Sequence, residues 1–175
     1  MCIRDSANTA GILLVHYENR NEARYSPEPV AISQDQGALI AEPALYGPDQ
    51  WWNTIEGCAI AHDCAAVWTS AAPSDGPQHN YAIWDFEGRS GRQTLECFIP
   101  HESAVATTKY EIWVEHKKVT TVSVNQRSIF GWTVLAQIEA GNDSRIEIVV
   151  RDNSASPVDS AIGIDACRIS FAPQA

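Results

Sequence analysis

Apolar and polar side chains alternate along residues 109–150, and turn-forming residues divide this stretch into short runs. The alternation resumes after a polar His-Lys-Lys turn, and a Gly-Asn-Asp turn separates two further runs. The first run places two sets of side chains on opposite sides of an extended chain, Tyr110, Ile112 and Val114 against Glu111, Trp113 and Glu115. Alternation with a period of two, bounded by Gly, Asn and Asp, is typical of half-buried antiparallel strands. The stretch therefore predicts a β-sandwich.

Shorter runs of strand length lie on both sides of this stretch. They are residues 12–15, 38–41, 65–70, 81–86, 93–99 and 161–171. Proline and glycine clusters separate them, and no segment shows the period of an amphipathic helix. About eight to ten strands at this spacing indicate an all-β protein, an antiparallel β-sandwich or jelly roll. Trp68, Trp84 and Trp132 stand in apolar, strand-like runs, so we expect them to fill the core.

An apolar run near the N-terminus is separated from the predicted sandwich by a polar segment. Residues 18–36 contain Pro27 and Pro29, which fit neither a helix nor a central strand, so we interpret them as a linker. The chain then divides into an N-terminal arm with its linker, residues 1–36, and a β-sandwich domain, residues 37–175. The arm is either an ordinary first strand of its own domain or a strand donated to a neighbouring subunit. Its predicted assembly residues are Ile12, Leu13, Leu14, Val15 and Tyr17.

The first six residues, MCIRDS, read as a translated remnant of sequence-assembly junk. On that interpretation Cys2 is not native, four cysteines remain to form pairs, and an export signal is missing upstream. If Cys2 is native, it is the leftover thiol that could join two chains.

The other four cysteines predict two disulfides. Cys58 and Cys64 flank a short polar loop that a disulfide could close, and Cys97 and Cys167 lie in strand-like runs that could be neighbours. Disulfides would place the protein outside the cytoplasm, on the cell surface or in the medium. The alternative is four buried free thiols. No cysteine or histidine spacing resembles a zinc site, so we predict no structural metal.

Charge and hydropathy restrict the partners. The formal net charge is −10, which repels phosphate backbones and excludes nucleic acid as an expected partner. No apolar segment is long enough to span a membrane. An acidic surface suits an extracellular protein.

The sequence predicts no catalytic site, because nucleophile elbows, zinc-protease motifs and phosphate-binding loops are missing. No cofactor is expected. Calcium is the one candidate ion, through Asp152, Asn153 and Asp159 or through Asp63, although turn formation explains these residues equally well. A glycosylation sequon begins at Asn142 in a predicted turn.

Sugar binding requires an exposed aromatic face with polar groups around it. Trp51 and Trp52 are adjacent, so an extended chain would turn one ring outward, and Trp113 shares a strand face with two glutamates. These three tryptophans are the predicted glycan-binding residues. The alternative for each is a core or subunit contact.

Residues 81–171 resemble the golvesin C-terminal-like domain, a β-sandwich of the galactose-binding-like kind. The segments that carry the resemblance are YAIWDF, QTLECFIP, ATTKYEIWVEHKKVTTVSVNQ, GWTVLAQIEAGNDSRIEIVV and IGIDACRISF. The resemblance implies a non-catalytic accessory or adhesion module of a secreted or surface protein. It also implies neighbouring strands for Cys97 and Cys167, which supports their cross-strand disulfide.

Two functions follow from different features. The arm resembles that of donor-strand-assembled pilins, which favours a filament subunit that binds copies of itself head to tail. The tryptophans favour a carbohydrate-binding accessory module of a secreted polysaccharide-active enzyme. We expect the filament first, and polysaccharide or a covalent glycan as a further partner.

Overall fold

A computed structural model of the chain describes residues 31–35, 38–57 and 61–171. This part contains strands and short 3₁₀ turns, with no α-helix among the described residues and hence none long and apolar enough to cross a membrane. The strands are β1 (Ala31–Asp35), β2 (Ala38–Ala41), β3 (Ala44–Tyr46), β4 (Asn53–Glu56), β5 (Ala65–Ser70), β6 (Tyr81–Glu87), β7 (Gly91–Ile99), β8 (Thr107–Val114), β9 (Lys117–Asn125), β10 (Gly131–Ala140), β11 (Arg145–Arg151), β12 (Ala161–Ile164) and β13 (Cys167–Phe171). The 3₁₀ turns are η1 (Asp49–Trp51), η2 (His62–Cys64), η3 (Gln126–Ser128) and η4 (Asp152–Ser154).

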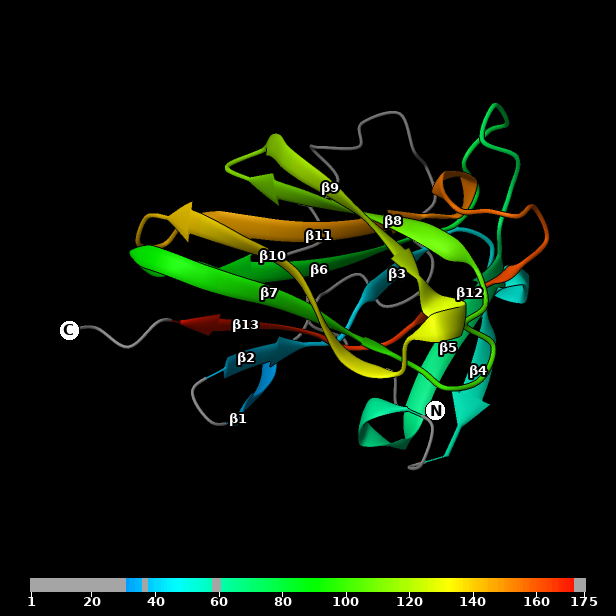
Figure 1. Cartoon of the computed structure of the whole chain (residues 1–175), viewed down its shortest axis with the longest axis horizontal. Coiled ribbons are helices and arrows are strands. Elements are labelled where there is room, and N and C mark those ends of the chain that lie inside the picture. Colours follow the sequence, from blue (N-terminus) through cyan, green and yellow to red (C-terminus); the bar gives the residue numbers. More distant parts are fainter. Residues whose placement is uncertain (1–30, 36–37, 58–60, 172–175) are drawn as a thin grey trace.

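Two five-stranded antiparallel sheets pack face to face (Figure 1). Sheet A has the strand order β1-β2-β13-β7-β10, and sheet B has the order β3-β6-β11-β8-β9. A third sheet, sheet C, has the order β12-β5-β4 and lies at one end of the sandwich (Figure 1). The predicted all-β antiparallel sandwich is confirmed.

The main core fills the space between sheets A and B. Trp84 on β6 is 1% exposed, and Ile112 on β8 and Leu95 on β7 are fully buried in the same cluster. Their neighbours in sequence point to the other face of each sheet, as the period of two requires. A buried amide, Gln126, joins the sandwich to sheet C, since its Nε2 donates to the Gly163 carbonyl at 2.8 Å. The burial of Trp84 in this cluster confirms its predicted core position.

The other two predicted core tryptophans lie elsewhere. Trp132 pairs with Phe98 across β10 and β7, and Phe98 alternates with the inward-facing Cys97. Cross-strand partners share a face, so Trp132 lies on the outer side of sheet A, where the Arg168 guanidinium stacks 4.3 Å from its ring. Trp68 is half-buried and packs against a small separate cluster beside sheet C. An apolar run alone did not reveal which face each ring would take.

The predicted final strand, residues 161–171, is two strands in different sheets. β12 pairs with β5 in sheet C, whereas β13 lies between β2 and β7 in sheet A. The break falls at Asp165, whose carboxylate accepts backbone N–H groups of His62 at 2.9 Å and Ala166 at 2.7 Å. Its carbonyl also accepts the Trp84 indole N–H at 2.9 Å. These hydrogen bonds fix the point where the chain passes from sheet C to sheet A, which the run of apolar residues does not reveal.

The predicted linker contains an ordered strand. β1 lies within residues 18–36 and pairs with β2, so that Ala31 lies opposite Ala41. It is an edge strand, and edge strands tolerate the polar sequence that made it read as a linker. The arm itself, with Ile12, Leu13, Leu14, Val15 and Tyr17, lies outside the described residues.

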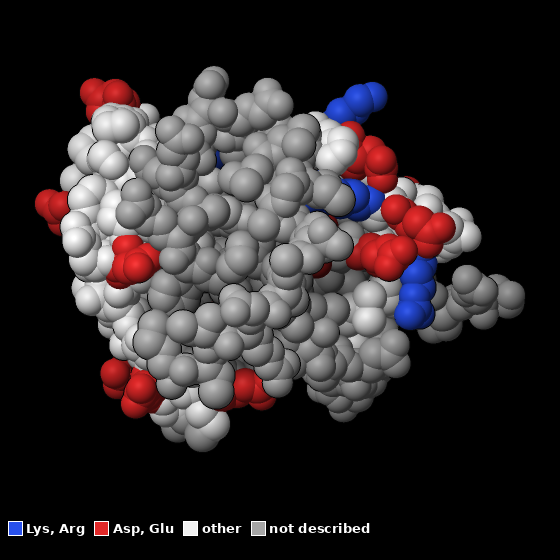
Figure 2. All heavy atoms as spheres, turned by 180° about the vertical axis from the view of Figure 1, so that it is seen from behind, with Lys and Arg blue, Asp and Glu red and all other residues white. Residues whose placement is uncertain are grey.

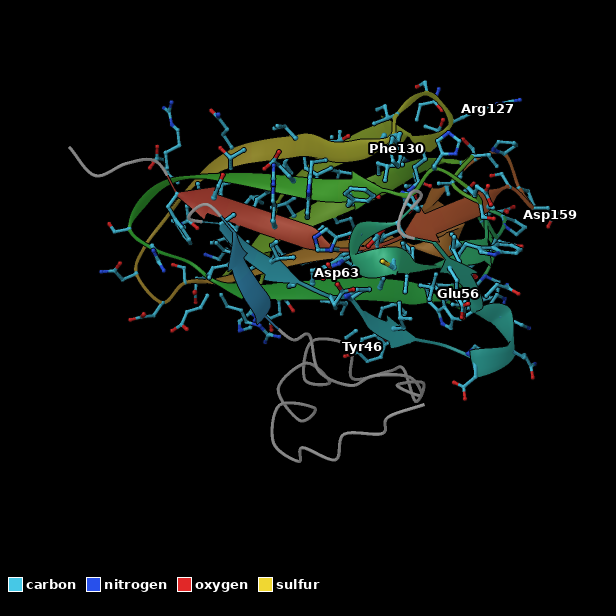
Figure 3. All side chains as sticks on the ribbon, turned by 90° about the horizontal axis from the view of Figure 1, so that it is seen from below. Tyr46, Glu56, Asp63, Arg127, Phe130 and Asp159 are labelled. Atoms are coloured by element: carbon cyan, nitrogen blue, oxygen red, sulfur yellow. The ribbon has the colours of Figure 1, made fainter. Side chains whose placement is uncertain are left out.

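A second apolar cluster lies on the outer face of sheet B. Figure 3 shows its member Tyr46 on the side of sheet B that faces away from β13. Tyr46 and Tyr81 stack with ring centroids 4.6 Å apart and are each 2% exposed. The other buried members are Ala44, Ile83 and Val149, and the half-buried Trp113 packs against them. Both faces of sheet B are therefore apolar at their centre.

The predicted Cys97–Cys167 disulfide is not formed. The two residues lie directly opposite each other on β7 and β13, so the predicted neighbourhood is correct, but both thiols are free and buried. The Cys97 thiol instead shares a hydrogen bond with the Tyr110 hydroxyl, and burial raises the pKa of Cys97 to about 12. The alternative of buried free thiols holds for this pair. Cys64 takes part in a disulfide, and because Cys58 lies outside the described residues, their pairing stays a prediction.

Candidate functional site

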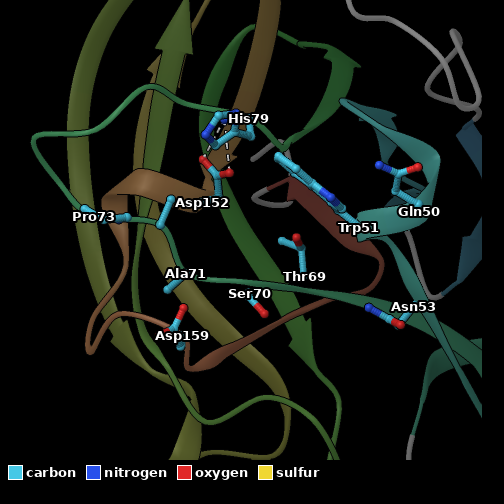
Figure 4. Close-up of a pocket in the computed structure, with 11 residues that line it drawn as sticks. Gln50, Trp51, Asn53, Thr69, Ser70, Ala71, Pro73, His79, Asp152 and Asp159 are labelled. Atoms are coloured by element: carbon cyan, nitrogen blue, oxygen red, sulfur yellow. Dashed lines mark hydrogen bonds between the residues drawn. The ribbon is translucent and has the colours of Figure 1, made fainter.

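An open pocket of about 420 Å³ lies where η1, β5 and the loop after η4 meet (Figure 4). Trp51 ends η1 and forms one wall, and Thr69 and Ser70 at the end of β5 form the floor. Asp159, from the loop before β12, lies across from Trp51. The full lining is Gln50, Trp51, Asn53, Thr69, Ser70, Ala71, Ala72, Pro73, His79, Asp152 and Asp159. Aromatic, amide, hydroxyl and carboxylate groups thus converge on one space.

Trp51 is the aromatic wall of this pocket. Its side chain is 41% exposed, which is unusual for the largest apolar residue. The His79 ring meets it edge-on, with centroids 4.8 Å apart and planes at 84°. This contact holds the indole in place without covering both of its faces. A flat apolar surface therefore remains available beside polar groups.

Asp152 organises the rear of the pocket through backbone hydrogen bonds. Its carboxylate accepts the His79 N–H at 3.1 and 3.2 Å and the Asn80 N–H at 2.8 Å. Burial raises the pKa of Asp152, and these backbone hydrogen bonds oppose that rise. The carboxylate thus holds the loop that carries His79 against β11. The interpretation of Asp152 as a calcium ligand is weakened, because its oxygens already serve the backbone.

Asn80 links the two walls. Its side-chain amide donates to the Thr69 hydroxyl at 2.6 Å and to the Trp51 carbonyl at 3.5 Å. Gly47 makes the close approach of these segments feasible, because a Cβ there would lie 2.1 Å from the Asn80 side-chain oxygen. Its φ of +116° also favours glycine. The position of Trp51 therefore depends on a turn that precedes it and a loop about thirty residues later.

The arrangement fits a neutral polyhydroxylated ligand. An indole face packs against C–H groups, and the surrounding amide, hydroxyl and carboxylate groups exchange hydrogen bonds with hydroxyls. His79 contacts Asp152 through its backbone N–H, which is not the side-chain contact that orients a catalytic base. The groups present can bind and orient a sugar.

The three predicted glycan-binding tryptophans do not share a site. Only Trp51 lines the pocket. Trp52 is half-buried and packs against the main core. Trp113 lies on the outer face of sheet B, where its indole N–H donates to Glu111 at 3.3 Å and the Lys118 ammonium lies 5.7 Å from its ring. The pairing of adjacent tryptophans indicated one outward ring, and that ring is Trp51.

Sequence reasoning missed most partners of Trp51 in the pocket. Asn53 begins β4, Ser70 ends β5 and His79 lies in the loop before β6, and polar residues are common at all three kinds of position. Asp159 was considered only as a calcium ligand. The proline-rich segment 71–80 marked a loop, but no local signal placed that loop beside η1. Long-range contacts were needed to assemble this set.

A second cluster could hold a metal ion. One ligand atom from each of Glu42, His62 and Asp63 lies within 4.8 Å of the others. The His62 Nδ1 is 4.0 Å from Glu42 and 3.6 Å from Asp63. An imidazole with two carboxylates suits a transition metal better than calcium. Of the predicted calcium residues, Asp63 alone belongs to this cluster.

Burial dominates the electrostatics of that corner. Desolvation, with a smaller effect of the Asp63 charge, raises the pKa of Glu42 to about 7. Desolvation also raises the pKa of Asp165 to about 7, although its hydrogen bonds from His62 and Ala166 work against this. Two carboxyl groups at the corner where sheet A meets sheet C therefore have pKa values of about 7.

Charge elsewhere on the described surface is mostly negative. Figure 2 shows Asp and Glu side chains around the rim of one face, with the Lys and Arg side chains of that view gathered at one end. The sequon residue Asn142 is exposed, and its side chain accepts the Ser90 N–H at 2.9 Å.

No protein-family model matches the chain, and no curated protein matches it. The golvesin resemblance therefore stays a prediction. Among solved structures, the chain is similar to a GH26-CBM35 β-(1,4)-mannanase of Podospora anserina, with 11% identity and a TM-score of 0.48. That match covers 77% of this chain and 29% of the mannanase chain.

Two further structures are similar over most of their own length. For TmCBM61 in complex with β-1,4-galactotriose, the identity is 13%, the TM-score 0.48, and the coverage 72% of this chain and 86% of that one. A family 35 carbohydrate-binding module from Clostridium thermocellum is 16% identical, with a TM-score of 0.45. That match covers 83% of this chain and 99% of the module. What this chain binds has to be decided from its own residues.

Proposed function

We propose that the protein is a carbohydrate-binding module and that the Trp51 pocket is its binding site. The observation that carries this proposal is the Trp51 indole, held edge-on by His79 and 41% exposed at the mouth of a pocket. Ser70, Asn53 and Asp159 supply hydrogen-bonding groups within reach of the same space. Polysaccharide chains present both the C–H faces and the hydroxyls that such a pocket accommodates.

Titration with a panel of soluble polysaccharides, followed by tryptophan fluorescence, tests this function. We expect at least one polysaccharide to change the emission of the full chain and Trp51→Ala to weaken its binding at least tenfold, about 1.4 kcal/mol. Trp113→Ala is the matched control, because Trp113 is a half-buried tryptophan on the outer face of sheet B and does not line the pocket. No response across the panel, or a loss caused by Trp113→Ala rather than Trp51→Ala, would contradict the proposal.

Self-assembly through a donated N-terminal strand is a second candidate, and one observation favours it. Among the described strands, sheets A and B end in β10 and β9, each paired on one side only, and a groove of about 460 Å³ runs between them. Val122, Leu135 and Ile138 contribute apolar lining. An apolar strand from another copy, such as the run from Ile12 to Val15, would pair with an open edge there.

Sedimentation of the full chain at several concentrations, with electron microscopy, tests self-assembly. Val119 lines the groove and is 50% exposed, so Val119→Lys should abolish assembly without unfolding the domain. Val105→Lys is the control, since Val105 is 45% exposed and lies outside the groove. A chain that stays monomeric at every concentration would exclude this candidate and leave the sugar pocket unaffected.

A further inference from the structure

The Trp51 pocket carries negative charge that its described lining does not balance. Asp152 stands at the rear of the pocket, and Asp159 lies across from Trp51 (Figure 4). No described lysine or arginine lines the space, and of the described lining residues only His79 is basic. Charges of one sign along a cleft attract a ligand of the opposite sign. The lining therefore favours a ligand with a positive group and disfavours an anionic one.

Asp159 has an unpaired carboxylate, unlike several other acidic side chains of the described surface. Asp85 pairs with Arg145 at 2.7 Å, and Glu96 pairs with Arg168 at 2.6 Å. No described side chain forms a hydrogen bond or an ion pair with the carboxylate of Asp159. An exposed carboxylate is common by itself, but this one faces an indole across a pocket. Its charge is available to a ligand that enters there.

The backbone around Asp159 is fixed to the floor of the pocket. The Asp159 N–H donates to the Ala71 carbonyl at 2.9 Å, and the Ala71 N–H donates to the Ser160 carbonyl at 2.8 Å. Asp159 has a φ of +63°, in the left-handed region that aspartate adopts more readily than most residues. These hydrogen bonds hold the loop that carries the carboxylate, so a charged ligand meets a preorganised partner.

The charge of Asp152 is balanced by backbone N–H groups rather than by a described lysine or arginine. Its carboxylate accepts the N–H groups of His79 and Asn80. Burial raises the pKa of Asp152, because the charged form loses hydration. A positive group of a ligand would stabilise that charged form. Both carboxylates of the pocket therefore favour a cation.

The other side chains of the lining narrow this cation to an amino sugar. The exposed face of Trp51 attracts cations as well as the C–H groups of a sugar ring. The side chains of Ser70 and Asn53 present a hydroxyl and an amide that have no described hydrogen-bond partner. A simple organic cation would leave these groups unused, whereas a sugar offers them hydroxyls. A sugar in which an ammonium group replaces one hydroxyl engages all of them.

We propose that the Trp51 pocket selects sugar units with a free, protonated amine, such as the glucosamine units of a deacetylated polysaccharide, and that the Asp159 carboxylate recognises the amine. This inference rests on the proposed carbohydrate-binding function and adds the class of sugar. N-acetylation removes the positive charge, so acetylated units lose the ionic contact with Asp159. Uronic acids carry a carboxylate, which the two aspartates of the pocket repel.

Short oligosaccharides that differ only in their amino groups test this selection. A trisaccharide of β-1,4-linked glucosamine and its fully N-acetylated form are titrated into the full chain at about pH 6, where the free amines are protonated, and tryptophan fluorescence is followed. We expect the free amine to bind about tenfold more tightly, the effect of one hydrogen bond between charged groups. Equal affinities, or tighter binding of the acetylated form, would overturn the selection.

Asp159→Asn removes the charge and keeps the shape of the side chain. It should lower the preference for the free amine to less than about threefold and leave the affinity for the acetylated trisaccharide unchanged. Asp143→Asn is the matched control, because Asp143 is also exposed, has a φ of +57° and lies in the turn between β10 and β11, at the other end of the sandwich (Figure 1).

Both variants change the net charge by one unit, so the control accounts for general attraction between an amine and an acidic chain. A preference that falls equally in both variants would overturn the role of Asp159. So would an Asp159→Asn variant that loses affinity for both sugars together, because that result indicates a structural role.

The outcomes separate this inference from the proposed function. Polysaccharide binding that depends on Trp51 but shows no preference for the amine would overturn the inference and leave the carbohydrate-binding function intact. A preference for the amine that survives Trp51→Ala would place the recognition outside the pocket and overturn the inference as well. Absence of binding to every sugar would overturn both.

Discussion

The two faces of sheet B are equally apolar at their centre, but they are buried in different ways. On the inner face, Trp84 and Ile148 pack against the side chains of sheet A. On the outer face, Ile83 and Val149 are as completely buried, although their cluster contains no residue of another described element. The same strands thus supply an inner face that packs against sheet A and an outer face with an apolar cluster of its own.

The difference shows that the apolar pattern of a strand predicts the strand but not the layers that pack against its two faces. β6 reads Tyr-Ala-Ile-Trp-Asp-Phe-Glu, apolar on both sides over its first four residues. Such a run is typical of a strand covered on both faces. The sequence predicted a strand at residues 81–86, but its pattern does not show which layer packs against each face.

Trp84→Ala should produce the largest effect, because it empties the inner face. We expect the free energy of unfolding to fall by about 3–5 kcal/mol, from lost burial and the cavity that remains. The hydrogen bond from its indole to the Asp165 carbonyl is lost as well. Urea denaturation followed by circular dichroism measures the change. A loss below about 1 kcal/mol would contradict the assignment of Trp84 to the core.

The loss of unfolding free energy in Ile83→Ala measures how well the outer face is covered in comparison with the inner one. A covered isoleucine should cost about 2–4 kcal/mol when truncated, whereas a solvent-facing one should cost less than about 1. Val134→Ala is the control, since Val134 is 57% exposed on β10. Equal and small losses in both variants would show that the outer face of sheet B is open.

The buried carboxyl groups at the corner should make stability depend on pH. Glu42 and Asp165 have folded pKa values of about 7, above their ordinary values, so the folded state holds their protons more tightly than the unfolded chain. The unfolding free energy should therefore fall as the pH rises from about 4 to 7. Glu42→Gln should flatten this dependence and add on the order of 1 kcal/mol at pH 8, a figure discounted for the partial exposure of Glu42. Denaturation midpoints across this range, with Glu56→Gln as an exposed control, provide the measurement.

Trp51→Ala should have the smallest effect on stability, because its ring is partly in solvent. We expect a change within about 0.5 kcal/mol, alongside the loss of sugar binding expected above. Urea denaturation of the same preparation used for the titration checks this. A large loss of stability would mean that Trp51 supports the fold rather than a ligand.

Much of the sandwich could be predicted from alternation alone. The expected strand at residues 65–70 coincides with β5, the run at 81–86 is β6 without its last residue, and the run at 93–99 is β7 without its first two residues. β3 and β4 were missed because three or four residues are too few to show a period. β1 was missed because an edge strand can be as polar as a linker.

The candidate site was predicted only through Trp51. Two adjacent tryptophans in an extended chain would lie on opposite sides, which suggested that one ring faces outward. Trp51 instead ends the 3₁₀ turn η1, and its ring is the exposed one. Which ring it would be depended on the packing of Trp52 against the main core. Asn80 and Asp152, which position the pocket walls, follow η1 by about thirty and a hundred residues, and no local pattern connects them.

By itself the sequence predicted most of the strands and the antiparallel class of fold, because side-chain alternation and turn chemistry are local. The neighbourhood of Cys97 and Cys167 was predicted from the family resemblance instead. The tertiary structure decided which face each ring took and that the two thiols stay apart. It also brought Trp51, His79 and Asp159 to one pocket and gathered an apolar cluster on the outer face of sheet B. Those outcomes depend on which sheets meet, and contacts between distant segments leave no trace in a local pattern.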